Sequence, residues 1–267
     1  MSDDLSSTKT DSSDFGADEQ RRLVRDRYSS IATESSSCCD DSSAEENTRK
    51  IYSADEIGDA PAEADLGLGC GNPTAIASLQ AGETVVDLGS GGGFDCFLAA
   101  KEVGPDGHVI GVDMTPEMIE KARENSRKNE TSSVEFRLGE IEHLPVADES
   151  VDVIISNCVV NLSPEKSQVF SEAYRTLKPG GRLAISDVVL TAELPSDVQR
   201  DPESVSACVA GASQITELES ILHDVGFTEI SITPKEQSEE FIREWDDERD
   251  LSEYLVSANI EARKPVQ

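Results

Sequence analysis

The sequence predicts a doubly wound α/β fold, in which a mostly parallel sheet carries helices on both faces. Three observations predict it. Apolar runs of strand length alternate with helical segments from about residue 70, the connecting segments are long enough for crossover helices, and a glycine-rich loop follows the first run. A length of 267 residues suits one sizeable α/β domain with appendages.

Five apolar runs are the expected core strands: 84–88, 108–113, 134–138, 151–157 and 182–189. Helices are expected from Phe94, from Pro116 behind the N-cap Thr115, and from Ser163 to just before Pro179. A further helix over 214–225, ended by Gly226, precedes a strand at 228–233. The alternating run at 253–263 follows no clear crossover helix, so we expect it to be an antiparallel edge strand.

Composition divides the chain into four segments. Residues 1–18 are expected to be a disordered acidic tail, and 19–60 a helix over Glu19–Ser30 followed by a cysteine-bearing linker. Residues 61–190 form the predicted cofactor-binding core, and 191–267 a loop, the final helix and the C-terminal strands. Within the last segment, residues 190–213 lack periodicity and are expected to form a loop or cap over the sheet.

The net charge of −31 excludes some classes of partner. Such a surface repels phosphate backbones and anionic lipids, so we expect no nucleic acid and no membrane as partner. The acids are spread along the chain, which favours adaptation to high salt over an ordinary solvated surface. Neither a membrane-spanning run nor a signal pattern is present, so we expect a cytoplasmic protein.

The loop Gly89–Gly93 lies between the first strand and its helix. Glycines there let the backbone turn sharply and approach a ligand closely. A dinucleotide-binding loop would place a third glycine or alanine at position 94, where this chain has Phe94. The lysine of a P-loop is also missing. The loop therefore indicates a ligand that has no phosphate.

Carboxylates follow the strands in an order that suits such a ligand. Asp87 precedes the glycines and can face a cationic amino-acid end, and Asp113 ends the second strand, where it can accept two ribose hydroxyls. Gly139-Glu140-Ile141 follows the third strand and places a carboxylate and an apolar side chain near an adenine. Each acid alone could be a solvated turn residue. Together they predict S-adenosylmethionine, and hence a methyltransferase.

Six cysteines are present: Cys38, Cys39, Cys70, Cys96, Cys158 and Cys208. No pair has C-x-x-C spacing, and a disulfide framework is not expected in a cytosolic chain. Cys158 follows Asn157 at the carboxyl end of the fourth strand, where ligands bind in such sheets. Cys70, before a short helix at 73–79, and Cys208, in the irregular segment, can reach the same edge. Cys96 is interpreted as a packing residue.

Three thiolates from three loops would suit a soft, trigonal centre. As(III) prefers three sulfurs and keeps a lone pair, which can attack a sulfonium methyl group without a general base. The site would then act by proximity and alignment. The chain has only 3 histidines, which agrees with chemistry that needs no base. From the residues alone, a packing role for the three cysteines stays equally open.

Two sets of motifs add a resemblance to known families. VVDLGSGGG, VIGVDMTPEM and the strand ending at Asn157 resemble the class I methyltransferases over about residues 80–190. That resemblance implies a Rossmann-like, seven-stranded sheet with the donor over the carboxyl ends of the first strands. It also implies that Met114 lies beside the adenine, that Glu140 contacts the adenine amino group, and that Asp95 lines the methionine end.

LGLGCGNP, SNCVVNLSPEK and ACVAGA resemble the cysteine-bearing segments of arsenite methyltransferases, within a likeness that runs from about Tyr28 to Ala262. The resemblance implies that Cys70, Cys158 and Cys208 hold As(III), which arrives as a thiol complex. It further implies that a fourth cysteine, Cys38 or Cys39, takes part in thiol exchange. A small-thiol or thioredoxin-type reductant would complete such a detoxification reaction.

Three alternatives remain at this point. A methyltransferase of a small organic acceptor would need an acid or base near the methyl group. A non-catalytic metalloid-binding protein would need the thiols but none of Asp87, Asp113 or Glu140. A dehydrogenase is disfavoured by Phe94.

Overall fold

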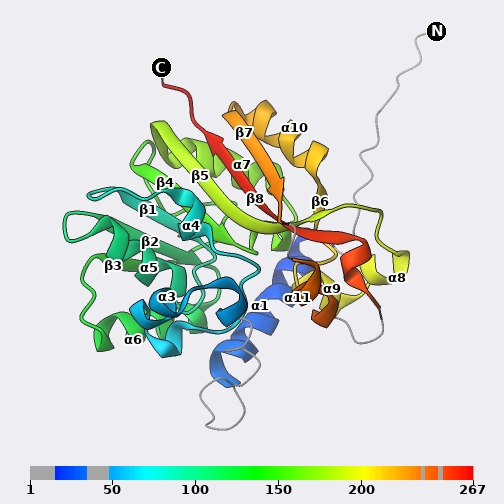
Figure 1. The fold of residues 1–267 in the computed structure, drawn as a ribbon, viewed down its shortest axis with the longest axis horizontal. Coiled ribbons are helices and arrows are strands. Elements are labelled where there is room, and N and C mark those ends of the chain that lie inside the picture. Colours follow the sequence, from blue (N-terminus) through cyan, green and yellow to red (C-terminus); the bar gives the residue numbers. More distant parts are fainter. Residues whose placement is uncertain (1–15, 35–47, 236–237, 246–248, 267) are drawn as a thin grey trace.

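The computed structural model describes residues 16–34, 48–235, 238–245 and 249–266. Most of the predicted tail at 1–18, and both Cys38 and Cys39, lie outside these ranges. The described chain is built around one twisted sheet with helices on both faces (Figure 1). None of the helices described has the length and apolar composition needed to cross a membrane.

The sheet has the strand order β3-β2-β1-β4-β5-β8-β7, with β6 paired to the end of β5. Strands β1 to β5 pair in parallel, whereas β8 is antiparallel to both of its neighbours, β5 and β7. The bounds are β1 Thr84–Leu88, β2 His108–Asp113, β3 Val134–Leu138, β4 Val151–Asn157, β5 Leu177–Leu190, β6 Ser213–Gln214, β7 Thr228–Pro234 and β8 Leu255–Arg263.

This arrangement confirms the predicted doubly wound, mostly parallel fold. The antiparallel pairing of the last strand is also confirmed, although β8 lies one place inside the edge because β7 pairs along its outer side. Strand β5 begins at Leu177, earlier than the expected 182, and its pairing with β4 shifts register between Val151 and Val153. The glycines at 180–181 therefore lie within a strand that continues through them.

The helix bounds are α1 Ala17–Glu34, α3 Ala54–Asp59, α4 Pro73–Ala77, α5 Phe94–Val103, α6 Pro116–Lys128, α7 Lys166–Thr176, α8 Ser196–Gln199, α9 Pro202–Ser206, α10 Ile215–Val225 and α11 Glu239–Ile242. Helices α5, α6 and α10 lie where the sequence predicts them, whereas α7 begins at Lys166 instead of Ser163 and α1 extends beyond the predicted Glu19–Ser30 at both ends. Asn72 caps α4 by accepting from the Ala75 N–H, with Pro73 in the first turn. The expected loop at 190–213 contains two short helices, α8 and α9, and the strand β6.

Two apolar clusters fill the two faces of the sheet. Successive residues of a strand point to opposite faces, so Val86 of β1 packs in the cluster with α7 and α10, and Val85 packs in the cluster with α5 and α6. A third cluster lies outside these two layers and includes Val24 of α1, Val198 of α8 and Ile242 of α11. It also contains Cys70, Cys158 and Cys208. Figure 1 shows α1, α9 and α11 gathered near the beginning of β8.

Candidate functional site

Two cavities lie side by side beyond the carboxyl ends of the parallel strands. The first is bordered by the ends of β1, β2 and β4, by the glycine loop and by segments from the N-terminal fifth of the chain. Its lining contains ten of the residues that the sequence predicts: Asp87, Gly89, Ser90, Gly91, Asp95, Asp113, Met114, Ile141, Asn157 and Cys158. The crevice expected for a doubly wound sheet is therefore present, with the expected residues around it.

The glycine loop has a backbone that other residues would not adopt easily. Gly89 has φ 69° and Gly91 has φ 50°, both in the left-handed region. A Cβ on Gly89 would lie 2.4 Å from Cγ2 of Val159, so a side chain there would collide with the chain that follows β4. The Gly91 N–H donates to the Asp113 carboxylate at 3.0 Å. The loop thus brings bare backbone to the cavity and fixes the acid of β2.

Four buried carboxylates line this cavity, and three of them, Asp87, Asp95 and Asp113, come from or follow β1 and β2; the fourth is Glu142. The donors to Asp113 are the N–H groups of Gly91 and Thr115, and burial raises its pKa. The Cys96 thiol donates to Asp87 at 3.2 Å. Cys96 is thus buried, as the packing interpretation expects, and also touches a carboxylate of the cavity.

Burial and the neighbouring charge of Asp95 raise the pKa of Asp87 well above its usual range. Burial raises the pKa of Asp95 to about 6, although the Tyr52 hydroxyl at 2.8 Å and the Asn157 amide at 3.1 Å donate to its carboxylate. The donors to these three acids are neutral N–H, O–H and S–H groups. A cation entering the cavity would therefore supply charge compensation that the hydrogen bonds do not.

The adenine contact expected of Glu140 stays a prediction. Gly139 and Glu140 are not in the described lining of the cavity, and the Glu140 carboxylate lies 3.5 Å from the Arg25 guanidinium of α1. Glu142, two residues further on, lines the cavity and accepts a hydrogen bond from Ser163 at 2.6 Å. The turn after β3 directs Glu140 toward α1, a helix far away in sequence, which local reasoning could not anticipate.

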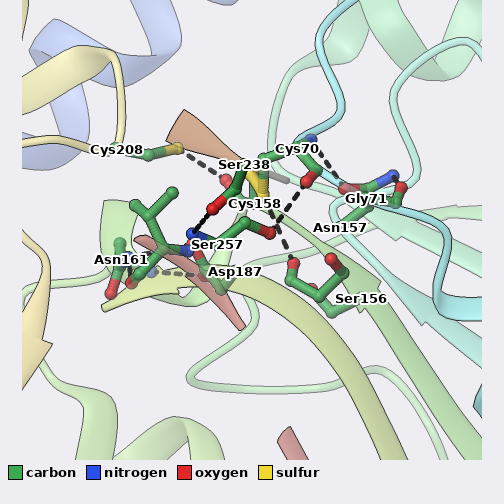
Figure 2. The surroundings of a disulfide bond; sticks show 12 residues. Cys70, Gly71, Ser156, Asn157, Cys158, Asn161, Asp187, Cys208, Ser238 and Ser257 are labelled. Carbon is green, nitrogen blue, oxygen red and sulfur yellow. Dashed lines mark hydrogen bonds between the residues drawn. A yellow bond between two sulfur atoms is a disulfide. The ribbon is translucent and has the colours of Figure 1, made fainter. Parts of the chain in front are cut away.

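Cys70 and Cys158 are joined by a disulfide, with their Cα atoms 5.9 Å apart and a sequence separation of 88 (Figure 2). This single disulfide was not anticipated from the sequence, which predicts only that no disulfide framework is present; Cys96 and Cys208 are free. Asn157 explains the approach, because its side-chain oxygen accepts from the Cys70 N–H at 3.1 Å and its amide donates to the Gly71 carbonyl. These two bonds tie the loop before α4 to the end of β4.

Cys208 approaches the same point from the segment after β5. Its thiol donates to the Cys158 carbonyl oxygen at 2.6 Å, and Figure 2 shows its sulfur directed at that oxygen. Burial raises the pKa of the Cys208 thiol well above its usual range, and the charge of Asp187 adds to this. The Tyr28 hydroxyl of α1 is hydrogen-bonded to the Cys208 sulfur. The sulfurs of Cys70 and Cys158 are thus bonded to each other, and the Cys208 thiol contacts the backbone of Cys158.

Both Cys158 and Cys208 have left-handed backbone conformations, with φ 56° and φ 66°. Such a conformation costs a non-glycine residue about 1–2 kcal/mol. The surrounding bonds hold Cys158 in place, because its N–H donates to the Ser186 carbonyl at 2.8 Å. Strain retained at two cysteines that meet beside a cavity is typical of a functional site.

Asp187 of β5 is a further buried carboxylate at this point, and sequence reasoning missed it. One of its oxygens lies within 4.8 Å of both disulfide sulfurs. It accepts hydrogen bonds from the Val188 N–H and from the backbone and side-chain N–H groups of Asn161, and burial raises its pKa to about 6. The signal that could have found it is a single acid within the apolar strand run LAISDVVL.

The second cavity adjoins the first and shares a wall with it. Tyr28, Ile51, residues 67–69 and Cys158 border both cavities, whereas Cys208 borders the second alone. Among the described lining residues, the first cavity has five acids and one base, and the second has three bases and two acids. The bases of the second cavity are Arg27, Lys50 and Arg249. Cys158 therefore lies where an acid-lined and a base-containing cavity meet.

Comparison with known proteins gives consistent results. Residues 79–226 match the protein family described as "Methyltransferase domain". The chain is 59% identical over 269 residues to the arsenite methyltransferase of Halobacterium salinarum, covering 95% of this chain and 69% of that protein. It is 41% identical over 152 residues to the human arsenite methyltransferase, covering 54% of this chain and 40% of the human one.

Among solved structures, the chain is similar to an arsenic(III) S-adenosylmethionine methyltransferase from Chlamydomonas reinhardtii. The identity is 32% and the TM-score 0.60, with 85% of this chain and 74% of that chain covered. A phosphoethanolamine N-methyltransferase of Haemonchus contortus, crystallised with S-adenosyl-L-methionine, has a TM-score of 0.60 at 20% identity. That second likeness shows the fold alone.

Proposed function

We propose, from the premise that this chain belongs to the arsenite methyltransferase family, that it transfers methyl groups from S-adenosylmethionine to As(III) held by Cys70, Cys158 and Cys208. The observation that carries this assignment is the place of Cys158. It lies in the wall between two cavities, is bonded to Cys70, and accepts the thiol hydrogen of Cys208 on its carbonyl oxygen.

The residues of the first cavity fit the donor. When bound, S-adenosylmethionine supplies a methyl group on a positively charged sulfur, together with an ammonium group. Asp87 and Asp95 provide the negative charge that such a cation needs, and both are held by neutral donors. Asp113 is fixed by two backbone N–H groups, with carboxylate capacity left for ribose hydroxyls. Met114 and Ile141 provide the apolar lining for an adenine.

The disulfide has to be reduced before all three thiols can bind arsenic. Two equivalents of a small thiol would reduce it and leave as their own disulfide, and a thioredoxin-type protein would supply the same two electrons. Such a reductant is expected in the cytoplasm, where we place the reaction. Cys38 or Cys39 is the candidate for a fourth thiol in this exchange, and both lie outside the described residues.

The transfer itself needs alignment more than it needs a base. As(III) bound by three thiolates keeps its lone pair on the side opposite the sulfurs, and that lone pair forms the new As–C bond. The His108 side chain is partly exposed beside Glu135, and the His143 side chain is largely exposed beside Glu140. Neither of them, nor the exposed His223, is in the described lining of either cavity. The enzyme therefore contributes proximity and orientation.

The disulfide pair agrees with the electron count of this reaction. Methylation of the arsenic lone pair raises arsenic to the pentavalent state. If two of the bound thiolates then leave as a disulfide, their two electrons return arsenic to the trivalent state. Cys70 and Cys158 are the pair that is bonded in the structure, which supports them as those two thiolates.

The test uses the full chain with As(III), a thiol reductant and methyl-labelled S-adenosylmethionine. We expect label in methylarsenic, and loss of at least about 100-fold in rate for Cys158→Ser, because one arsenic–sulfur bond can no longer form. Calorimetric titration with S-adenosylmethionine is the control for folding, and its affinity should change less than about threefold in that variant. Methylarsenic formation at the original rate by Cys158→Ser would contradict the assignment. So would the absence of label with the intact chain.

A further inference from the structure

We propose that the buried carboxylate of Asp187 stabilises the positive charge that arsenic acquires during methyl transfer. This inference rests on the proposed function, because it concerns the same transfer step. The role is electrostatic: the carboxylate acts on arsenic from beside the three thiolates and forms no bond to it.

The transfer step moves a charge from one atom to another. The lone pair of As(III) forms the new As–C bond, and the electron pair of the broken C–S bond stays on the donor sulfur. The donor sulfur becomes neutral, whereas arsenic, which is neutral when three thiolates bind it, becomes a cation. No proton moves. A negative charge fixed near arsenic therefore stabilises the transition state more than it stabilises the reactants.

Asp187 lies where that charge develops. One of its carboxylate oxygens is within 4.8 Å of the sulfurs of both Cys70 and Cys158, so arsenic bound by these two residues would be close to it. The residue is only 1% exposed and is in the described lining of neither cavity. Its carboxylate is thus enclosed by protein, where a charge acts more strongly than it does in water.

The carboxylate is already held in position in the structure. The Val188 N–H donates to it at 2.8 Å, the side-chain amide of Asn161 at 2.9 Å, and the Asn161 backbone N–H at 3.2 Å. Figure 2 shows Asn161 and Asp187 side by side. A carboxylate that is fixed in advance needs no reorganisation when the positive charge appears.

The same charge is unfavourable before arsenic binds. It raises the pKa of the Cys208 thiol, so it opposes formation of the thiolate that has to bind arsenic. A carboxylate whose only role was to prepare the thiols would therefore act against them. The benefit of Asp187 comes later, when a cation forms among the three sulfurs.

Lys166, the first residue of α7, carries the opposing charge at this point. Its ammonium group interacts electrostatically with both Asp187 and Cys208, and burial lowers its pKa. Burial raises the pKa of Asp187 to about 6, so its carboxylate is ionised at pH 7.5. Because the two charges have opposite signs, removing them one at a time should change the transfer rate in opposite directions.

The experiment measures a single turnover at pH 7.5. The reduced full chain, saturated with As(III), is mixed with less than one equivalent of methyl-labelled S-adenosylmethionine, and the appearance of label in methylarsenic gives the transfer rate. Arsenic affinity is measured without donor from the fluorescence of Trp245, which is the only tryptophan of the chain and lines the second cavity. Calorimetric titration gives the donor affinity.

We expect Asp187→Asn to slow the transfer about 100-fold. Its affinities for arsenic and for the donor should change less than about threefold, because the charge matters only once the cation forms. Lys166→Gln should transfer the methyl group about threefold faster, since it removes a positive charge near arsenic. Asp224→Asn is the matched control, because Asp224 is an exposed acid of α10 and is in neither described lining.

An unchanged transfer rate in Asp187→Asn overturns the proposal. A loss of arsenic affinity that equals the loss of rate overturns it too, because Asp187 would then be an arsenic ligand or a support for the fold. A rate that falls in Lys166→Gln as it does in Asp187→Asn has the same consequence, since the sign of the charge would not matter.

The two proposals fail in different ways. If all variants form methylarsenic at the rate of the unmodified chain, the role of Asp187 fails and the proposed function stands. If the unmodified chain binds arsenic and the donor but forms no methylarsenic, the proposed function fails, and the role of Asp187 fails with it.

Discussion

The two cavities share a wall but have opposite charge. The first has five acids and one base in its described lining, and the second has three bases and two acids. Under the proposed function, the acid-lined cavity takes the cationic methyl donor, and the second cavity gives access to Cys158 and Cys208 from the other side. The net charge of −31 gives no hint of this division.

The backbones of the two cavities differ as well. Gly89 and Gly91 of the first cavity have positive φ angles and present bare backbone to it, and Gly67, which borders both cavities, has one as well. At the border of the second, positive φ angles are adopted by Cys158 and Cys208, which must keep a side chain to bind anything. Glycine adopts a positive φ at no cost where only bare backbone is needed. A cysteine that has to present a thiol at such a position retains the backbone strain.

The largest expected effect is that of replacing Asp87, which lines the first cavity and not the second. Replacing it with asparagine removes a buried charge from the first cavity only. We expect the affinity for S-adenosylmethionine, measured by calorimetry, to fall about 100-fold, or about 3 kcal/mol. Arsenic binding, followed by Trp245 fluorescence, should change less than about twofold. Asp106→Asn, at an exposed turn, is the control. A comparable loss in arsenic affinity would break the comparison, because the two sites would then be one.

A smaller effect follows from the titration of Asp95, whose pKa is about 6 in the folded chain, raised by burial. The cationic donor prefers the ionised carboxylate, so its affinity should fall by up to about tenfold as the pH is lowered from 7.5 to 5. The stability of the ligand-free chain should show the opposite trend. Because the pKa of Asp95 is higher in the folded chain than in the unfolded chain, its contribution to stability is fully present below the pKa of the unfolded chain. That contribution is lost as the pH rises through about 6.

Calorimetry and urea unfolding at each pH measure the two trends. The Asp95→Asn variant cannot titrate, so its donor affinity should be nearly independent of pH over this range. A donor affinity of the unmodified chain that stays constant between pH 5 and 7.5 would argue against the role given to Asp95.

The smallest expected effect concerns the shared wall. Tyr28 borders both cavities, and its hydroxyl is hydrogen-bonded to Cys208. Tyr28→Phe keeps the ring and removes the hydroxyl, at a cost of about 0.5–1.5 kcal/mol. We expect about a threefold loss of arsenic affinity and less than a twofold change for the donor. A change in donor affinity alone would contradict this prediction, because it would show that the Tyr28 hydroxyl acts on the first cavity and not on Cys208. Cys208→Ala in the same background should abolish the difference between tyrosine and phenylalanine.

Several features stay predictions. Cys158→Ser tests the cysteine ligands, whereas the exchange role of Cys38 or Cys39 rests on the family resemblance alone. The adaptation to high salt also stays a prediction, since charge composition is its only support. The segment boundaries at 18, 60 and 190 are likewise expectations. In the described part, residues from the second and last segments pack in one cluster, which contains Val24 and Leu255 together with Cys158.

The sequence by itself determined the features that local pattern encodes. Strand and helix periodicity, the glycine loop at 89–93 and the acids at the ends of β1 and β2 all depend on neighbours in the chain. Tertiary structure alone decided which distant residues meet. It bonded Cys70 to Cys158 through the contacts of Asn157 and turned Glu140 toward Arg25. It also gathered the bases of the second cavity from three segments. These contacts depend on how whole elements pack, and no local preference records that packing.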